Sequence, residues 1–425
     1  MNRTIPPPSR SISHFDIIRA ETVNLSNGID LHLVNSGTHD ILQLEIILRS
    51  GKWFEKVNGE SFFTARMLTE GTNTMSSRQI SEFFETYGVQ FKAIPGIDLV
   101  TLSAVMLNKH FDKILPVIAE CLFDPVFPVD ELETLKELEK QELKVSQEKG
   151  SYISLKEFRK MVYGGRHPYG RSLEIGEING GINPELLRKF HSTCLLNGME
   201  IILTGKLNQT YIDKVNAVFG NRILTSSGAT NGEVSISPFP ENRKDVLKPG
   251  SLQTSVRYGK RSIGKTHPDF PGLMVANELL GGFFGSRLMK NIREEKGYTY
   301  GIYSGIVNYL NDSFFVISAD LVREHTENAI LEINKEINRL QTEEVKADEL
   351  DTVKNYMLGS FLSSLETSFS HAEKFKAIHY FGQGYDFYDR YIETIKNITP
   401  SEIASLANRY FSTGEFSLVT VGDKG

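Results

Sequence analysis

An arginine and a tyrosine seven residues apart are the side chains in this sequence most suited to chemistry. Arg293 ends a short run typical of a helix, and Tyr300 lies in the run that follows it. Arginine donates a rigid fork of hydrogen bonds, and tyrosine donates one hydroxyl. Together they could hold a peptide carbonyl or stabilise a developing oxyanion. A purely structural interpretation, with a capping arginine and a half-buried strand tyrosine, stays open on residue types alone.

The surrounding residues predict how this pair is positioned. Leu288 and Ile292 repeat at helical spacing and should face a core. Gly297 should end that short helix, because glycine adopts a left-handed cap without steric cost. From residue 298 the pattern alternates as in a strand, which would place Tyr300 on the same face as Ile302. We therefore expect a tight helix-to-strand corner that brings the cation and the phenol together.

Composition excludes several classes of function. The 425 residues suggest two or three domains. A net charge of −6 without a basic run argues against nucleic acid as a partner. The two cysteines, Cys121 and Cys194, are too few for a disulfide framework or a cysteine zinc site. No run approaches the ~20 apolar residues of a membrane span, and the first residues lack a signal-like apolar segment. A cytoplasmic location is the expectation, and whether a leader was removed stays open.

The order of predicted elements divides the chain into an N-terminal half at 1–220, a linker at 221–250 and a C-terminal half at 251–425. The linker is inferred from its Thr, Ser, Gly, Asn and Pro content. In the first half we expect strands at 21–34, 41–50, 89–93, 99–107 and 200–204, and helices at 60–69, 76–87, 110–121, 130–148, 151–162, 184–192 and 209–219. In the second half we expect strands at 252–259, 298–306, 313–321 and 416–421, and helices at 272–280, 324–340, 348–366, 371–381, 386–396 and 400–411, besides the short helix before Gly297.

The two halves repeat in residues as well as in order. A Ser-Arg pair precedes Gly88 by the same spacing at which a second Ser-Arg pair precedes Gly297. By this spacing the counterpart of Arg293 is Phe84, and that of Tyr300 is Phe91. One copy of the repeat thus lacks the polar pair, so the fold does not demand it. Homologous halves often face each other across a cleft in which ligands bind.

Taken together, the two halves, the Gly-Gly-x-x-x-Ser-Arg-Leu run and the Arg-x6-Tyr pair resemble the insulinase/pitrilysin family of zinc peptidases. These are inverzincins, related to the mitochondrial processing peptidase, and their signature is His-x-x-Glu-His. The resemblance covers nearly the whole chain. It implies an α+β clamshell of two homologous halves, each a mainly antiparallel sheet packed against helices. It also implies that Arg293 and Tyr300 are catalytic ligands of substrate and transition state, with Gly281, Gly282 and Phe283 binding substrate.

The sequence departs from this family at the metal motif. In the family the motif stands just ahead of a Gly-Thr pair, where this chain has Phe62 and Arg66 in place of the histidines and Ala65 in place of the general base. Phenylalanine and alanine cannot ligate zinc, and a permanently charged guanidinium does not. Glu142 could match the third ligand, but no His-x-x-Glu-His or His-x3-His occurs elsewhere. We therefore expect no metal and no other cofactor in this chain.

These features resemble the non-metal subunit of a heterodimeric metallopeptidase. The resemblance implies a homologous partner subunit that carries His-x-x-Glu-His and zinc, a peptide substrate, and no activity in the isolated chain. A homodimer in isolation stays possible. The alternative within the family is a catalytically inactive scaffold or peptide-binding relative, which would not need Arg293 and Tyr300.

A remote alternative is a nucleotide-binding enzyme. Residues 259–266, which run from Gly259 to Thr266 and include Lys265, match the phosphate-loop pattern Gly-x4-Gly-Lys-Thr. That motif needs a helix beginning at its Lys-Thr pair. Here Pro268 and Pro271 follow at once, and proline disfavours helical geometry in the residue before it. We interpret the segment as a solvated strand-to-helix loop.

Overall fold

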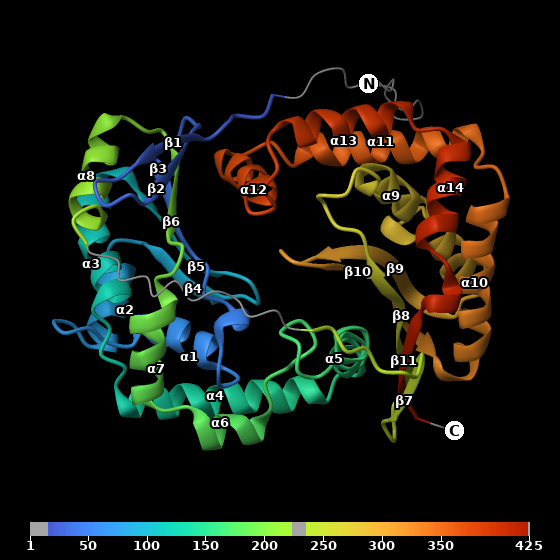
Figure 1. Ribbon diagram of the computed structural model, residues 1–425, viewed down its shortest axis with the longest axis horizontal. Helices are drawn as coiled ribbons and strands as arrows, with labels where there is room; N and C mark the ends of the chain where they lie inside the picture. The colour runs from blue at the N-terminus through green and yellow to red at the C-terminus, as the bar shows by residue number, and fades with distance from the viewer. Residues whose placement is uncertain (1–15, 223–234, 424–425) are drawn as a thin grey trace, which may run out of the picture.

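The computed structural model describes residues 16–222 and 235–423, which form two β-sheets with helices around them (Figure 1). The first sheet has the strand order β1-β2-β6-β3-β5-β4, and the second has the order β7-β11-β8-β10-β9. The strands of the first sheet are β1 (Glu21–Asn24), β2 (Asp30–Asn35), β3 (Ile41–Leu48), β4 (Gln90–Pro95), β5 (Val100–Leu107) and β6 (Glu200–Gly205). Those of the second are β7 (Arg243–Leu247), β8 (Gln253–Ser262), β9 (Thr299–Asn308), β10 (Ser313–Val322) and β11 (Ser417–Gly422).

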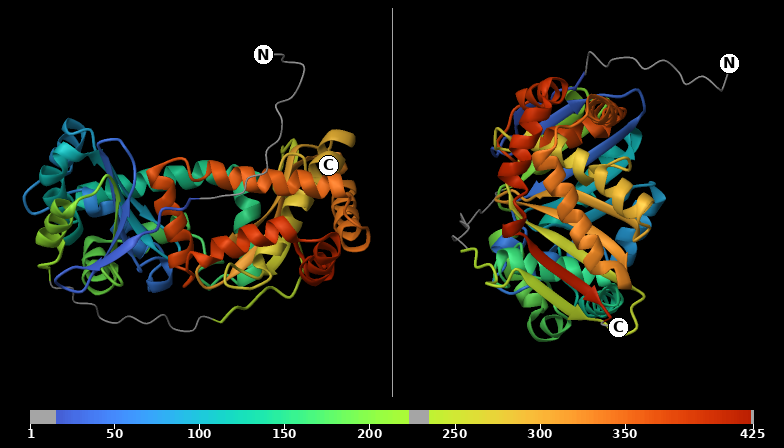
Figure 2. Two further views of the ribbon diagram at one scale, coloured as in Figure 1. Left: turned by 90° about the horizontal axis from the view of Figure 1, so that it is seen from above. Right: turned by 90° about the vertical axis from the view of Figure 1, so that its right-hand side faces the viewer.

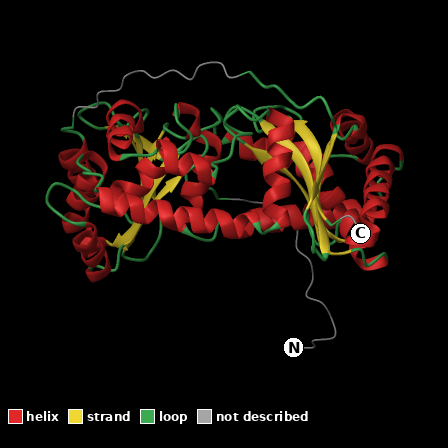
Figure 3. Ribbon diagram, turned by 90° about the horizontal axis from the view of Figure 1, so that it is seen from below, coloured by secondary structure: helices red, strands yellow, loops and turns green. Residues whose placement is uncertain are grey.

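Helices surround both sheets. The first half contains α1 (Glu60–Arg66), α2 (Ser77–Thr86), α3 (Phe111–Phe123), α4 (Val129–Gln147), α5 (Gly150–Tyr163), α6 (Ile175–Gly181), α7 (Pro184–Phe190) and α8 (Gln209–Phe219). The second contains α9 (Phe270–Asn277), α10 (Thr326–Thr342), α11 (Ala347–Ser363), α12 (Ser368–His379), α13 (Asp386–Asn397) and α14 (Pro400–Tyr410). Figure 3 shows helices outside each sheet and between the two sheets. None of these helices is long and apolar enough to cross a membrane.

The repeat predicted from the sequence is confirmed in the topology. Each sheet is antiparallel except for one parallel pair, β2 with β6 in the first and β7 with β11 in the second. The last strand of each half lies between two earlier strands, β6 between β2 and β3 and β11 between β7 and β8, and an edge strand follows the helices of the corner, β4 in one and β9 in the other. The predicted α+β clamshell of two mainly antiparallel halves is therefore correct, and the turned view shows the halves side by side (Figure 2).

One helix of each half packs against the sheet of the other half. Helix α5 packs against β8 and β11 of the second sheet, and α12 packs against β2 and β6 of the first. These helices occupy matching places in the repeat, each after the long helix of its half. Phe158 of α5 shares a buried cluster with Phe314 and Val419, and Phe375 of α12 shares one with Val34 and Ile202. Apolar burial of this kind stabilises the contact between the halves.

Local signals explain where the elements near the corners begin and end. Helix α2 begins with a capping box, in which the Ser76 side chain accepts from the Gln79 amide and the Gln79 side chain accepts from Ser76. Gly88 and Gly297, the predicted helix stops, have φ angles of 64° and 68°. Both lie in the left-handed region that glycine adopts most easily.

Several boundaries differ from the predictions. The predicted linker at 221–250 contains strand β7. This strand was not predicted, because its mostly polar sequence does not reveal that it pairs with β11. Residues 223–234 of the linker lie outside the described residues. The single strand predicted at 21–34 is two strands separated by a turn at Gly28, whose φ is 85°. Helix α6 was not predicted, since its seven residues end in two glycines.

Candidate functional site

The structure brings Arg293 and Tyr300 together at the predicted corner, but not through the phenol. Arg293 lies in a π-helical turn, Met289–Glu295, and its Nε donates to the backbone carbonyl of Tyr300 at 3.0 Å. Its guanidinium lies 4.7 Å from the centre of the Phe284 ring, a cation–π contact that sequence reasoning did not single out. The guanidinium is thus fixed on two sides, and the Tyr300 ring is free to project from the surface.

A β-bulge gives Tyr300 its exposure. The pairing of β9 with β10 shifts between Ala319 and Leu321, which face Ile302 and Thr299. Two residues of β9 therefore oppose one of β10, and such bulges re-aim side chains. The Thr299 hydroxyl donates to the carbonyl of Asp320 at 2.7 Å and so occupies part of the interrupted ladder. The predicted alternation is wrong here, since Ile302 is fully buried while Tyr300 is 91 % exposed.

The predicted substrate-binding residues all have contacts within the second half. A Cβ on Gly281 would lie 2.9 Å from the Ser304 amide nitrogen, so glycine permits the close approach of this segment to β9. A Cβ on Gly282 would lie 2.6 Å from the carboxylate of Glu278. The Phe283 ring packs at 4.8 Å against that of Tyr356. These contacts account for the residue types structurally, and their role toward substrate stays a prediction.

A largely buried carboxyl group, that of Glu278, lies directly beside these glycines. Burial raises the pKa of Glu278 to about 6. Its Oε2 has no hydrogen-bond partner among the described residues. A second acid nearby has hydrogen-bond partners. Glu349 of α11 accepts from Arg287 at 2.8 and 2.9 Å, which links the Ser-Arg-Leu run to that helix. Arg287 is therefore a structural residue of the motif.

The positions of the family's zinc ligands lie on α1 and do not fit zinc. The Phe62 ring packs at 5.2 Å against that of Phe63, and the Arg66 guanidinium lies 5.9 Å over the Phe62 ring. Ala65 is fully buried and has no side-chain donor atom. Glu142 is exposed on α4. Because apolar side chains and a fixed positive charge occupy these positions, α1 has no set of oxygen, nitrogen or sulfur ligands for the ion.

The phosphate-loop match does not form a phosphate site. Helix α9 begins at Phe270, so no helix N-terminus points at the loop residues Lys265 and Thr266. The Lys265 ammonium donates to the carbonyl of Ala377 at 3.2 Å and lies 4.6 Å over the Phe381 ring. Burial lowers the pKa of Lys265, and the neighbouring Lys374 lowers it further. The lysine is engaged with the end of α12, as expected of a strand-to-helix loop and not of a nucleotide cradle.

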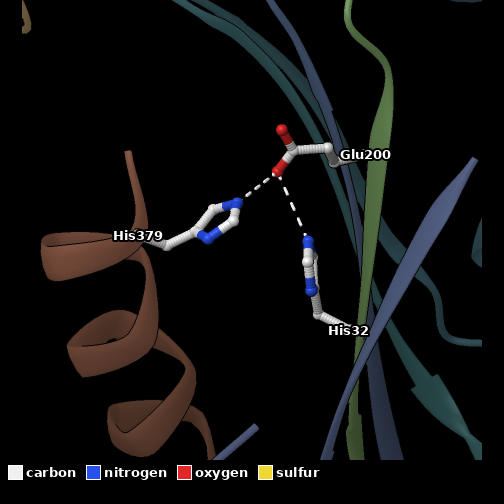
Figure 4. Close-up of side chains that lie close together, drawn as sticks. All are labelled: His32, Glu200 and His379. Carbon is white, nitrogen blue, oxygen red and sulfur yellow. Dashed lines mark hydrogen bonds and ion pairs between the residues drawn. The ribbon is translucent and has the colours of Figure 1, made fainter. Parts of the chain in front are cut away.

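A polar group that the sequence did not predict joins the two halves. One carboxylate oxygen of Glu200 in β6 lies within hydrogen-bond distance of two histidines, His32 of β2 and His379 of α12 (Figure 4). Burial alone would raise the pKa of Glu200. Hydrogen bonds with both histidines and the electrostatic attraction of His379 and Arg49 outweigh burial and hold this pKa below its ordinary value. No local spacing in the sequence could have indicated this cluster, because it forms only where α12 of the second half packs against the sheet of the first.

Comparisons with known proteins agree with this geometry. Residues 33–174 match the family model described as insulinase (Peptidase family M16), and residues 181–357 match the model described as the peptidase M16 inactive domain. The uncharacterized zinc protease YmxG of Bacillus subtilis (strain 168) is 25 % identical over 405 residues, which cover 94 % of this chain and 97 % of the relative. The non-peptidase homolog YmxG of Helicobacter pylori (strain 26695) is 21 % identical over 364 residues, covering 85 % and 83 %.

Solved structures show the same fold. A peptidase M16 inactive domain from Pseudomonas fluorescens superposes with a TM-score of 0.87 at 22 % identity, covering 96 % of this chain and 98 % of that one. A protease from Helicobacter pylori superposes with a TM-score of 0.84 at 19 % identity, covering 96 % and 100 %. With two M16 models matching successive halves of the sequence and the repeated architecture in place, this chain belongs to the insulinase (M16) family of peptidases.

Proposed function

We propose that this chain is the non-metal, substrate-binding subunit of a heterodimeric zinc metallopeptidase. The observation that carries the proposal is the contrast between the two motif positions. Helix α1 presents Phe62, Ala65 and Arg66 where zinc ligands would stand. The second half instead presents an exposed Tyr300 beside an Arg293 whose side chain is held by a hydrogen bond and a ring contact. A polar pair held in this way is suited to a ligand supplied from outside the chain.

The two residues would act by positioning the peptide. The Nε contact with the Tyr300 carbonyl and the Phe284 ring restrain the Arg293 side chain, so its remaining N–H groups can donate to a substrate carbonyl. The Tyr300 hydroxyl supplies a further donor for the oxygen on which negative charge develops. The Arg293 guanidinium is held in place before substrate binds, which reduces the cost of organising it in the transition state, while the exposed Tyr300 ring is accessible to substrate.

Strand β9 supplies a second means of recognition. It lies at the edge of the second sheet, with β10 on one side and no strand on the other among the described residues. An extended peptide can add to such an edge through main-chain hydrogen bonds, which favour unfolded substrates of many sequences. Tyr300 lies at the start of this strand and Arg293 donates to the Tyr300 carbonyl, so both would meet the same peptide.

Zinc would come from a homologous partner that carries His-x-x-Glu-His. When bound there, it would supply an activated water and polarise the scissile carbonyl. The isolated chain would then have neither catalytic metal nor general base on α1 and would cleave no peptide. Self-association of the isolated chain and a cytoplasmic location stay predictions.

A second candidate function is an inactive, peptide-binding scaffold. It is favoured by the similarity to two proteins described as inactive, the non-peptidase homolog of Helicobacter pylori and the inactive domain of Pseudomonas fluorescens. A scaffold could bind peptide at β9 without any contribution to turnover. The two functions therefore differ in whether Arg293 and Tyr300 affect a rate.

Reconstitution separates these functions. The chain would be assayed on an unfolded fluorogenic peptide alone with added zinc, then mixed with the His-x-x-Glu-His homologue from the same organism. We expect no cleavage by either chain alone and cleavage by the pair, lost when the partner's motif histidines are replaced. A partner that is fully active by itself, with no gain from this chain, would favour the scaffold.

A further inference from the structure

A cluster of two histidines and one glutamate lies where the two halves meet. His32 Nε2 is 3.4 Å and His379 Nε2 is 2.7 Å from Glu200 Oε2, and the three ligand atoms lie within 4.8 Å of one another. His32 is 1 % exposed, while the His379 side chain is 30 % exposed. The cluster is thus buried on the side of the sheet and open to solvent on the side of α12.

These atoms match the donor set of a divalent transition metal. Zinc binds imidazole nitrogen and carboxylate oxygen at about 2.0–2.2 Å, so ligand atoms around one ion lie about 3.3 Å apart. The separations in the cluster bracket that value, and small side-chain rotations would bring all three atoms to one ion. Two histidines and one carboxylate also leave a coordination position for water.

The surrounding residues support both the ligands and their orientation. The Thr22 hydroxyl lies 2.8 Å from His32 Nδ1, an oxygen partner of the kind that metal-bound histidines use to fix their tautomer. The same hydroxyl can donate to Nδ1 when no metal is present, so the ring is held in either state. Arg49 Nη2 lies 3.3 Å from the other carboxylate oxygen, Oε1, which leaves Oε2 directed toward the histidines.

The fold alone does not explain this cluster. Helix α5 makes the matching contact with the second sheet, contains no histidine, and is linked to β7 by the ion pair of Lys244 with Glu157 at 2.5 Å. Helix α12 has its own ion pair of this kind, Lys376 with Glu45 of β3 at 2.8 Å. The histidine cluster is therefore an addition to one of two related contacts.

We propose that His32, Glu200 and His379 form a zinc-class metal site that fastens α12 of the second half to the sheet of the first. The site is separate from α1, where the metal motif of the family is lost. Bound metal would favour the conformation in which the halves are docked, because it draws ligands from both. This inference does not rest on the proposed peptidase role.

Metal titration of the full chain tests the proposal directly. Protein without a polyhistidine tag would be freed of metal with a chelator and titrated with zinc chloride against a chromophoric chelator. We expect one equivalent to bind with a dissociation constant on the order of micromolar or below. Glu200→Gln and His379→Gln should each weaken binding by at least about tenfold, the lower limit seen even when only a residue that hydrogen-bonds to a metal ligand is changed.

Hydrogen exchange gives a readout specific to the contact between the halves. Zinc should slow exchange of the α12 amides in the wild-type chain and not in His379→Gln, whose amide can keep a hydrogen bond to Glu200. His39→Gln, at an exposed histidine outside the cluster, serves as the matched control and should leave zinc binding unchanged. The proposal would be overturned if the wild-type chain did not bind zinc, or if Glu200→Gln and His379→Gln bound zinc as tightly as the wild-type chain.

Discussion

The corner between α2 and β4 and the corner before β9 are two copies of one arrangement with different contacts. In the first, the rings of Phe84 and Phe91 pack 5.0 Å apart, and β4 pairs with β5 without a shift. In the second, Arg293 and Tyr300 occupy the matching positions, and the pairing of β9 is interrupted by a bulge. The same spacing therefore supports an apolar contact in one half and a polar surface in the other.

This difference separates what the fold requires from what a ligand would require. A glycine in the left-handed region ends the helical segment in both copies. The contact across the corner differs: Phe84 is buried where Arg293 is half-buried, and Phe91 is half-buried where Tyr300 is almost fully exposed. An apolar pair stabilises its own half through burial. A polar pair beside a strand bulge contributes little to stability, which agrees with the binding role proposed for it.

The largest expected effect is on the stability of the first corner. Phe84→Ala should lower the free energy of unfolding by about 3–5 kcal/mol, because it removes a buried ring and leaves a cavity. Arg293→Ala should lower it by only about 1 kcal/mol, the value of an exposed cation–π contact. Urea unfolding followed by circular dichroism would measure both, with Phe91→Ala as a second apolar variant. Equal losses at Phe84 and Arg293 would contradict the comparison.

The second corner should instead determine turnover. In the reconstituted pair, Arg293→Ala or Tyr300→Phe should lower the rate by about 10²–10³-fold, the usual cost of losing one oxyanion donor. The variants should not dissociate the pair, as size-exclusion chromatography would show. Phe84→Ala and Phe91→Ala should change the rate little in whatever protein stays folded. Full activity of both Arg293→Ala and Tyr300→Phe would make the pair structural and favour the scaffold.

Features coded by neighbouring residues were predictable from the sequence. Helical spacing at Leu288 and Ile292, the stop at Gly297 and the repeat of the Ser-Arg pairs gave the corner and its counterpart. These signals are local, and they hold because helix caps and apolar periodicity depend on residues within a few turns. The proximity of Arg293 and Tyr300 is of this kind, since seven residues separate them.

Features that depend on packing between distant segments were not predictable. The bulge at Tyr300 depends on how β9 pairs with β10, and alternation alone cannot reveal an inserted residue. The polar strand β7 is an edge strand that only its partner β11 identifies. The cluster of His32, Glu200 and His379 needs both the sheet and the exchanged helix α12. Single-sequence reasoning has no access to such contacts.

The matching glycine caps test whether the two corners depend equally on the same backbone conformation. Gly88→Ala and Gly297→Ala should each cost about 1–2 kcal/mol, because a side chain is strained in the left-handed region. Steric clashes add nothing at either position, since a Cβ on Gly88 or Gly297 would meet no atom within 4 Å. Thermal unfolding should therefore show similar shifts for the two variants. Markedly unequal shifts would mean that only one corner depends on its cap.

The smallest expected effect concerns Glu278, which has no acidic counterpart in the first half: the same spacing leads to Thr69. Burial raises the pKa of Glu278 from 4.5 to about 6, so the folded chain binds more protons than the unfolded chain between these pH values. The free energy of unfolding then falls as pH rises through this window, and the loss persists above it. Glu278→Gln removes the ionisation, so the variant should match the wild-type chain below pH about 4.5 and exceed it above pH about 6. Because the group is partly exposed, we expect a gain of about 1 kcal/mol or less. Urea unfolding at a series of pH values would measure it, and a difference that does not change with pH would show that burial has not shifted this carboxyl group.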